Sequence, residues 1–422
     1  MLHTYRRKKN GKFYRRKVTE EHISLISEPG SKYMGHFAPK TGTAHCISAA
    51  ILKFAKEKDI SLNSLDAVGC DGTVLNTGTK GGIIRLLEES LQRPLHWFIC
   101  MLHANELPLR HLLADIDGKT NGPHGFTGPI GTKLKHCETL PIVSFAPIVA
   151  SIDSITMEEL STDQRYLYEI HQAVSQGKIS EALAMRSPGN LNHSRWLTTA
   201  NRILRLYVAT ENPSDNLLCL AYFVMTVYAP MWLKIKTNPH VQTGAKHISE
   251  TLKLVKKQNI RIQSIVMPVI ERNAYFIHPE NLLLLMIGDE KPYIRELGWR
   301  RIKTARAMVS SPNVRHFNMP KLNPDCNNYS EIINWEETTI TEPPMTMKFS
   351  DNDLEDFIVN KKLFDTEKYP LHTQAVERVI KVVSEASSKV CSHEAREGFI
   401  LTRLASRERM SSFESKKDYV PK

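Results

Sequence analysis

The stretch that decides the fold runs from Leu65 to Leu113 and reads LDAVGCDGTVLNTGTKGGIIRLLEESLQRPLHWFICMLHANELPLRHLL. An apolar run leads straight into Asp71, and a turn rich in Gly, Thr and Asn follows. An amphipathic segment comes next, and then a second apolar run that ends in Cys100-Met-Leu-His103. The pattern predicts strand, helix, strand, helix, with Asp71 at the end of one strand and His103 just past the next. In open α/β sheets, ligands bind at this edge.

Composition describes a globular, basic chain. Of its 422 residues 41% are hydrophobic, enough for a real core. Lys and Arg number 56 against 45 Asp and Glu, a formal charge of +11, and such an excess favours polyanionic partners. Seven cysteines without a repeated spacing indicate reduced thiols, and the first residues, MLHTYRRKKNGKFYRRK, lack the apolar segment of a secretory signal. We therefore expect an intracellular protein.

A long helical region follows the opening stretch. The pattern is helical nearly throughout from Thr156 to Ser310. Within it, Leu217 to Leu233 is 17 residues without a charge, which is short for a membrane span and predicts a buried helix, so no membrane partner is expected. Residues Ser311 to Met347 carry several prolines and little periodicity, which indicates a linker. Two helical segments follow, at 352–360 and 373–390.

Two basic segments are candidates for nucleic-acid contact. The first 17 residues contain Arg6, Arg7, Lys8 and Lys9 and no acidic residue. This segment is a solvated arm, a nucleic-acid contact or a nuclear-import signal. The second is the helix Arg295–Arg306, with Arg300, Arg301 and Lys303, for which a solvated face is the alternative to phosphate contact.

The order of segments is informative as a whole. It reads β, β, α, β, α, β, α, then the helical block and a late helix with Glu377. This is the order of an RNase H-like mixed-sheet α/β core interrupted by a large all-helical insertion. The core would comprise residues 1–147 and 346–422, and 148–345 would be the insertion and linker. Such cores hold two divalent metals between carboxylates, and hard carboxylate oxygens suit Mg²⁺.

Four short motifs then resemble those of the hAT-superfamily transposases. They are Cys70-Asp71-Gly-Thr-Val-Leu-Asn76, Cys100-Met-Leu-His103-Ala-Asn105-Glu-Leu107, Ser194-Arg195-Trp196, and Pro370-Leu-His-Thr373-Gln-Ala-Val-Glu377-Arg378. The resemblance implies an RNase H-like fold, DNA as partner and a nuclear location. It also implies that Asp71 and Glu377 are catalytic Mg²⁺ ligands and that His103 lies near the scissile phosphate. Arg195 and Trp196 would contact nucleic acid.

The chain also departs from that pattern. Asn76 lies one residue further from Asp71 than in the family, and Asn105 one residue closer to His103. The family's first catalytic Asp belongs on a strand well upstream of Asp71, and no such residue is evident. We therefore expect an incomplete catalytic centre. Two functions remain open: a DNA strand-transfer enzyme, if an upstream Asp exists, and a non-catalytic nucleic-acid or protein-interaction module, domesticated or decayed. Homo-oligomerisation is left open.

Each candidate residue also has an ordinary structural interpretation. Asp71 caps the helix that follows a strand in many proteins. His103 is as consistent with a structural role as with phosphate positioning. Trp196 is also typical of a side chain that anchors the core. Glu377 and Arg378 are also typical of a surface ion pair. Cys70 and Cys100 are expected to be small core residues.

Overall fold

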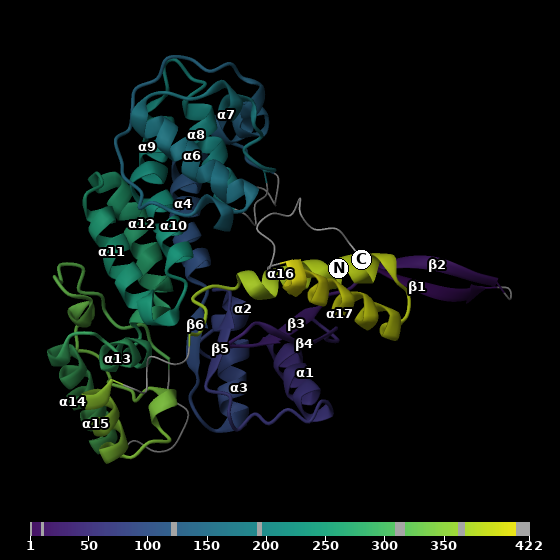
Figure 1. Cartoon of the computed structure of the whole chain (residues 1–422), viewed down its shortest axis with the longest axis vertical. Helices are drawn as coiled ribbons and strands as arrows, with labels where there is room; N and C mark the ends of the chain where they lie inside the picture. The colour runs from purple at the N-terminus through teal and green to yellow at the C-terminus, as the bar shows by residue number, and fades with distance from the viewer. Residues whose placement is uncertain are drawn as a thin grey trace. The chain divides into compact units, whose positions relative to one another are not determined.

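The computed structural model describes residues 2–9, 12–119, 125–191, 196–308, 317–361 and 368–410 (Figure 1). The chain is mixed α/β and mostly helical, with small sheets, which confirms the predicted fold class at this coarse level. It divides into two compact units. The first contains the described residues of Met1–Leu95 and Glu367–Lys422, and the second those of His96–Ser311 and Phe317–Thr366.

Two antiparallel hairpins open the first unit. Strands β1 (Leu2–Lys9) and β2 (Lys12–Thr19) form one hairpin, and β3 (Ile23–Ser27) and β4 (Lys32–Phe37) form the other. The order read from the sequence has two strands before the first helix, where the described residues form four. The chain turns between β3 and β4 at Gly30, whose φ of 101° lies in the region that favours glycine.

The next elements follow the predicted order. They are helix α1 (Ala44–Glu57), strand β5 (Ala67–Cys70), the short helix α2 (Val74–Thr77) and helix α3 (Ile83–Leu91). Their apolar residues meet in one core of Ile47, Ile83, Leu87 and Leu95, all buried. This core explains the helical spacing of the apolar residues in α1 and α3, since each of these two helices presents one apolar stripe to the other.

The end of the chain completes the same unit. Helices α16 (Gln374–Lys389) and α17 (His393–Met410) pack against the β3–β4 hairpin, as the yellow and purple elements of Figure 1 show. Their shared core consists of Val379, Val382, Val383, Ala386 and Ile400, with Ile26 and Tyr33 of the hairpin against it. The first unit is therefore built from both ends of the chain.

In the residues that the structure describes, the second unit is a helical body with one short strand. Its longer elements are β6 (His96–Ile99), α4 (Met101–Asp117), α6 (Thr162–Gln176), α8 (Trp196–Tyr207), α9 (Asp215–Phe223), α10 (Ala229–Thr237), α11 (Gly244–Lys256), α12 (Ile260–Asn273), α13 (Pro279–Ile287), α14 (Pro292–Ala307) and α15 (Asp351–Asn360). Shorter ones are α5 (Pro129–Lys133) and α7 (Glu181–Met185), with the 3-10 turn η1 (Leu134–Thr139) after α5.

The apolar stretch near residue 225 is a core helix. A continuous helix spans Asp215–Thr237 and is long and apolar enough to cross a bilayer, but 67% of its most apolar window is buried inside the protein. A π-helical turn at Val224–Tyr228 interrupts it just before Pro230. Proline lacks the N–H that an α-helical bond requires, so the wider turn accommodates it. The prediction of a buried helix is confirmed.

The segment from Ser311 to Met347, predicted to be a linker, is irregular but is not a free connection in its described part. The described part, from Phe317 onward, is irregular, as the prolines indicate, but it packs into the second unit. Phe317 is 2% exposed and stacks on Trp97, with ring centroids 4.0 Å apart. Ile332 and Ile333 are buried as well. The linker interpretation was wrong for this part, because a few anchoring side chains hold it without any regular periodicity. The predicted boundary at 147 falls inside the second unit.

Candidate functional site

Asp71 closes the loop between β5 and α2. Its Oδ1 accepts hydrogen bonds from the backbone N of Thr73 at 3.0 Å, from Thr73 Oγ1 at 2.7 Å and from Asn76 Nδ2 at 2.8 Å. Asp followed by Gly-Thr forms such side-chain turns readily, because a short carboxylate reaches the amide two residues on. The side chain is half-buried. Asp71 thus has a local structural role, but it does not cap α2, whose N-cap residue is Thr73. One carboxylate oxygen is fully taken up by the loop.

Glu377 lies in the first turn of α16, where a negative charge is favourable beside the free N–H groups of the helix. Its side chain is exposed, and Oε1 accepts a hydrogen bond from Thr373 Oγ1 at 3.1 Å. Glu377 belongs to the same unit as Asp71, whereas His103, half-buried on the first turn of α4, belongs to the other unit.

These residues do not fit a two-metal centre. In two-metal centres generally, several carboxylates converge on two ions that lie about 3.5–4 Å apart. Among the residues that the structure describes, no group of three or more His, Cys, Asp or Glu side chains is placed to hold a metal ion. Asp71 and Glu377 instead bond to neighbours in their own loops. We therefore derive no catalytic step through Mg²⁺.

The predicted nucleic-acid contact at Trp196 is wrong. Trp196 begins α8, is only 3% exposed, and meets the edge of Phe126 with ring centroids 6.1 Å apart. A side chain buried in this way has no free face for a base, so the alternative of a core anchor is correct. Its neighbour Arg195 lies outside the described residues.

The basic helix α14 is largely engaged inside the protein. The Arg301 guanidinium lies 3.9 Å from the ring centroid of Trp335 and pairs with Glu331 at 3.4 Å. Lys303 pairs with Glu355 at 3.8 Å. These contacts hold α14 to the segment that follows it, and the Arg301 side chain is only 15% exposed. The guanidinium of Arg301 is therefore engaged within the second unit, whereas Arg300 is exposed and Lys303 keeps part of its surface.

The basic residues at the start of the chain lie on the β1–β2 hairpin. Its register places Arg6 opposite Arg15, Arg7 opposite Tyr14, and Lys9 opposite Lys12. The side chains of Arg6, Arg7, Lys8 and Lys9 are outside the described part of the structure. The backbone register alone shows that positively charged positions run along both strands of a two-stranded ribbon.

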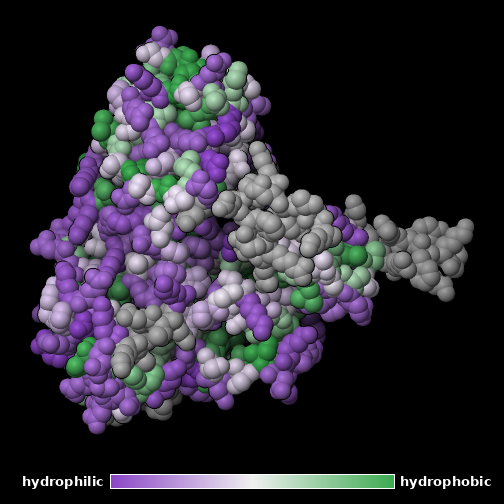
Figure 2. All heavy atoms as spheres, viewed as in Figure 1, coloured by the Kyte–Doolittle hydropathy of each residue, from purple (hydrophilic) through white to green (hydrophobic). Residues whose placement is uncertain are grey.

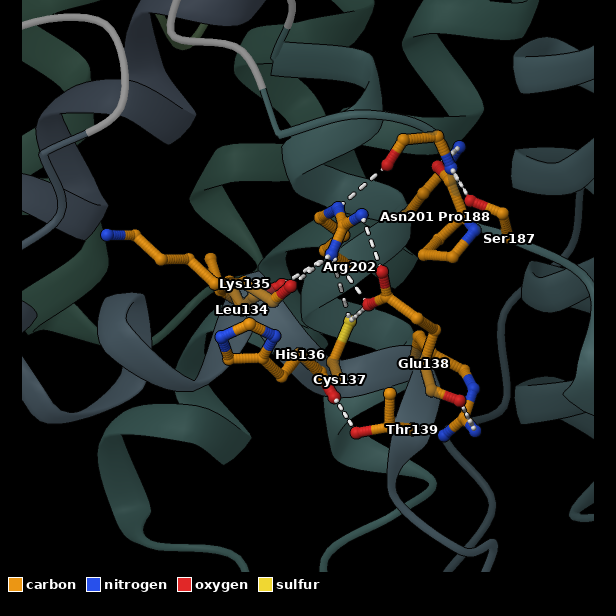
Figure 3. Close-up of polar contacts among 12 residues, drawn as sticks. Leu134, Lys135, His136, Cys137, Glu138, Thr139, Ser187, Pro188, Asn201 and Arg202 are labelled. Atoms are coloured by element: carbon orange, nitrogen blue, oxygen red, sulfur yellow. Dashed lines mark hydrogen bonds and ion pairs between the residues drawn. The ribbon is translucent and has the colours of Figure 1, made fainter.

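One polar cluster of the second unit, centred on Arg202, was not predicted. Arg202 of α8 is 4% exposed, and its Nη1 and Nη2 bond to the two carboxylate oxygens of Glu138 at 2.8 and 3.1 Å (Figure 3). Nη1 also donates to Leu134 O at 2.6 Å, and Nε to Gly189 O at 2.8 Å. One guanidinium thus joins η1, α8 and the turn at Pro188-Gly189.

The pKa values of the two titrating groups in this cluster shift in opposite directions. The Cys137 thiol is fully buried, which raises its pKa to about 12, so it remains protonated and is no nucleophile. Burial also acts to raise the pKa of Glu138, but the hydrogen bonds and charge of Arg202 outweigh it and lower that pKa. No motif in the sequence pointed to this cluster, since its residues are remote along the chain and individually unremarkable in type.

Comparison with known proteins finds no family model, curated protein or solved structure that matches this chain.

Proposed function

We propose that this chain is a transposase-derived DNA-binding protein whose first unit descends from a Mg²⁺-dependent strand-transfer core. One observation supports this ancestry, and it concerns which residues belong to the first unit. Asp71 and Glu377 share it, although a separate, mainly helical unit occupies most of the chain between them. A core interrupted by a helical insertion requires this arrangement, and the order of the four sequence motifs agrees with it.

The β1–β2 hairpin is the element that we assign to DNA. Residues 1–17 hold eight basic residues and no acidic one, and the ribbon brings several of them opposite each other. A two-stranded ribbon fits the major groove, and Lys and Arg contacts to phosphates supply most of the affinity of non-specific binding. A DNA partner accounts for a nuclear location, which is part of the proposal.

Binding without strand transfer is the form of the function that we favour. The Asp71 carboxylate already accepts three hydrogen bonds from its own loop, and Glu377 one from Thr373. All three bonds end on Oδ1, so Asp71 offers a metal ion only its second carboxylate oxygen, and no group of three metal-ligating side chains surrounds it among the described residues. We therefore propose a domesticated or decayed relative that retains the DNA-binding surface.

A protein-interaction module is the second candidate, and one observation favours it. The short helix α2, directly after Asp71, exposes Val74 by 82% and Leu75 by 41%. Apolar side chains this exposed on an ordered helix suit contact with another protein, including a second copy of this chain.

Fluorescence anisotropy with a labelled duplex tests the proposal. We expect the full chain to bind, and the fourfold variant Arg6→Gln, Arg7→Gln, Arg15→Gln, Arg16→Gln to bind at least tenfold more weakly. The matched control changes four exposed basic residues elsewhere, Lys56, Lys58, Lys257 and Arg261, to Gln and alters the net charge equally. Equal losses in both variants would reduce the effect to overall charge and reject the hairpin.

A nicking assay separates binding from catalysis. Supercoiled plasmid incubated with the full chain and Mg²⁺ should show no nicking beyond that of the Asp71→Asn variant. Nicking by the wild type that Asp71→Asn abolishes would establish an active centre at Asp71 and overturn the non-catalytic form of the proposal.

A further inference from the structure

A long extended segment lies on the second unit between η1 and α6. Residues 141–156 run without a helix, a turn or a bend. Connections of this length without regular structure are uncommon inside a compact unit, and those that occur often serve binding. The hydrogen bonds of this segment show which of its two sides is occupied.

From Ala146 to Ala150, every second residue bonds to the helices α6 and α8. Ala146 O accepts a hydrogen bond from a tyrosine hydroxyl of α8 at 2.6 Å. Ile148 N donates to Val174 O of α6 at 3.2 Å. Ala150 N and O bond to Ser175 Oγ of α6 at 3.3 and 2.9 Å. A period of two is the period of a β-strand, so this part of the segment is held as a strand is held by its neighbour.

The residues between these leave their backbone groups unpaired. Val149 and Ser151 form no backbone hydrogen bond with any residue that the structure describes, and neither does the carbonyl of Pro147. Alternate residues of a strand direct their N–H and C=O groups to opposite sides. The unpaired groups therefore line the side that faces away from α6 and α8, which is the situation of an edge strand.

This edge lacks the charges that protect most edge strands. Ile148 is buried, whereas Val149 is 83% exposed and Ser151 is exposed. Edge strands are commonly protected from pairing by charged side chains, Lys above all. In this chain 24% of the residues are charged, yet none of residues 139–152 is. An exposed β-branched side chain beside unpaired backbone groups suits the addition of another strand.

The partner that this edge fits is a second copy of the same segment. Two identical strands that pair antiparallel about a two-fold axis present the same groups to each other. With the axis at Val149, the two copies of Val149 exchange N–H···O bonds, and Ser151 N of each copy donates to Pro147 O of the other. Because residues 139–152 are neutral, two chains of formal charge +11 meet here without like charges facing each other.

We propose that residues 146–152 of two copies pair as antiparallel strands and join the second units of two chains into a homodimer. The pairing uses only backbone groups that the fold leaves unpaired. It does not rest on DNA binding, because every residue involved belongs to the second unit.

Sedimentation velocity of the full chain over a concentration series tests the proposal. Val149→Pro removes an N–H that the pairing requires and that the fold does not use, so this variant should dimerise at least tenfold more weakly than the wild type. Met185→Ala is the matched control, since Met185 is also apolar, 79% exposed and part of the second unit, and it should dimerise as the wild type does. A wild type that stays monomeric throughout the series, or a Val149→Pro dimer as stable as that of the wild type, would overturn the proposal.

Cysteine cross-linking tests the register. Directly opposite residues of a hydrogen-bonded antiparallel pair have Cα atoms about 5.5 Å apart, within reach of a disulfide, so diamide should link Val149→Cys into a covalent dimer. In the same register the two copies of Ser151 lie four residues apart, roughly 13 Å, so Ser151→Cys should give only the background of the native cysteines. Equal cross-linking of the two variants would reject the pairing. If Val149→Pro does not fold, this comparison decides alone.

Discussion

At the scale of single residues, the buried arginines of α8 matter more than the motifs that drew attention in the sequence. Arg202 satisfies two backbone carbonyls and a carboxylate with one planar group, which a lysine could not reproduce because its ammonium lacks the fork geometry. The cluster fixes the segment from Leu134 to Thr139 onto α8. Its role is structural, and it stabilises the second unit.

Replacing Arg202 by alanine should therefore destabilise the protein strongly. The change leaves Glu138 and the carbonyls of Leu134 and Gly189 without their donor. Removing one partner of a buried ion pair costs roughly 3–5 kcal/mol of unfolding free energy. Urea unfolding followed by circular dichroism measures it. Arg300→Ala, at an exposed position of α14, is the control and should change stability by about 0.5 kcal/mol or less.

His171 predicts how stability depends on pH. It is 1% exposed on α6, its Nε2 bonds to Met225 O at 2.9 Å, and burial lowers its pKa from 6.5 to about 4. Between these two pH values the unfolded chain binds a proton at His171 that the folded chain does not bind. The contribution of neutral His171 to the free energy of unfolding is therefore complete above pH 6.5 and is lost as the pH falls toward 4. The loss amounts to about 3 kcal/mol.

Urea titrations at several pH values compare wild type with His171→Gln, which keeps an N–H donor for Met225. The variant should lack this decline, while His393→Gln, at an exposed position, should retain it. A decline of the same size in His171→Gln would show that another group causes it.

At the scale of elements, α16 shows how the end of the chain is held. One side of the helix is buried against β3, β4 and α17, with Val383 fully buried, while Ile380 remains 41% exposed. The surface of the face in view is mostly hydrophilic, with apolar side chains in small scattered groups (Figure 2). The attachment of α16 therefore depends on its buried stripe.

Val383→Ala should lower the unfolding free energy of the first unit by about 2 kcal/mol, through lost apolar burial and the cavity left behind. Ile380→Ala removes more carbon from the same helix, yet should cost less, because that side chain is already partly in water. Hydrogen exchange of the β3–β4 amides reports on this unit specifically. A larger loss of protection from Ile380→Ala than from Val383→Ala would contradict the packing described.

Several elements could be predicted from the sequence, and physical reasons explain the others. Periodicity located α1, α3 and α16 because each helix has one apolar face, and an apolar run located β5. The segment after Phe317 has no such period, since a stack on Trp97 far away in the chain holds it. The engagement of Arg301 and the burial of Trp196 also depend on distant partners. Whether Asp71 is free for a metal depends on its own loop, and its sequence is compatible with either role.

At the scale of the whole molecule, both ends of the chain form one unit and a helical body is inserted between them. The proposed transposase ancestry rests on this organisation. The proposed DNA contact rests on the basic ribbon formed by β1 and β2. The two parts of the proposal stand separately. A unit built from both ends of the chain does not imply DNA binding, and a basic ribbon does not imply descent from a transposase.

The most direct test of the central claim is the salt dependence of DNA binding by the full chain. Phosphate contacts lower log K linearly with log salt, with a slope of about −0.9 per contact on duplex DNA. The account predicts a steep slope for the wild type and a slope shallower by roughly 2–4 for the fourfold variant of Arg6, Arg7, Arg15 and Arg16. Binding that salt leaves unchanged, or a slope that the variant leaves unaltered, would contradict it.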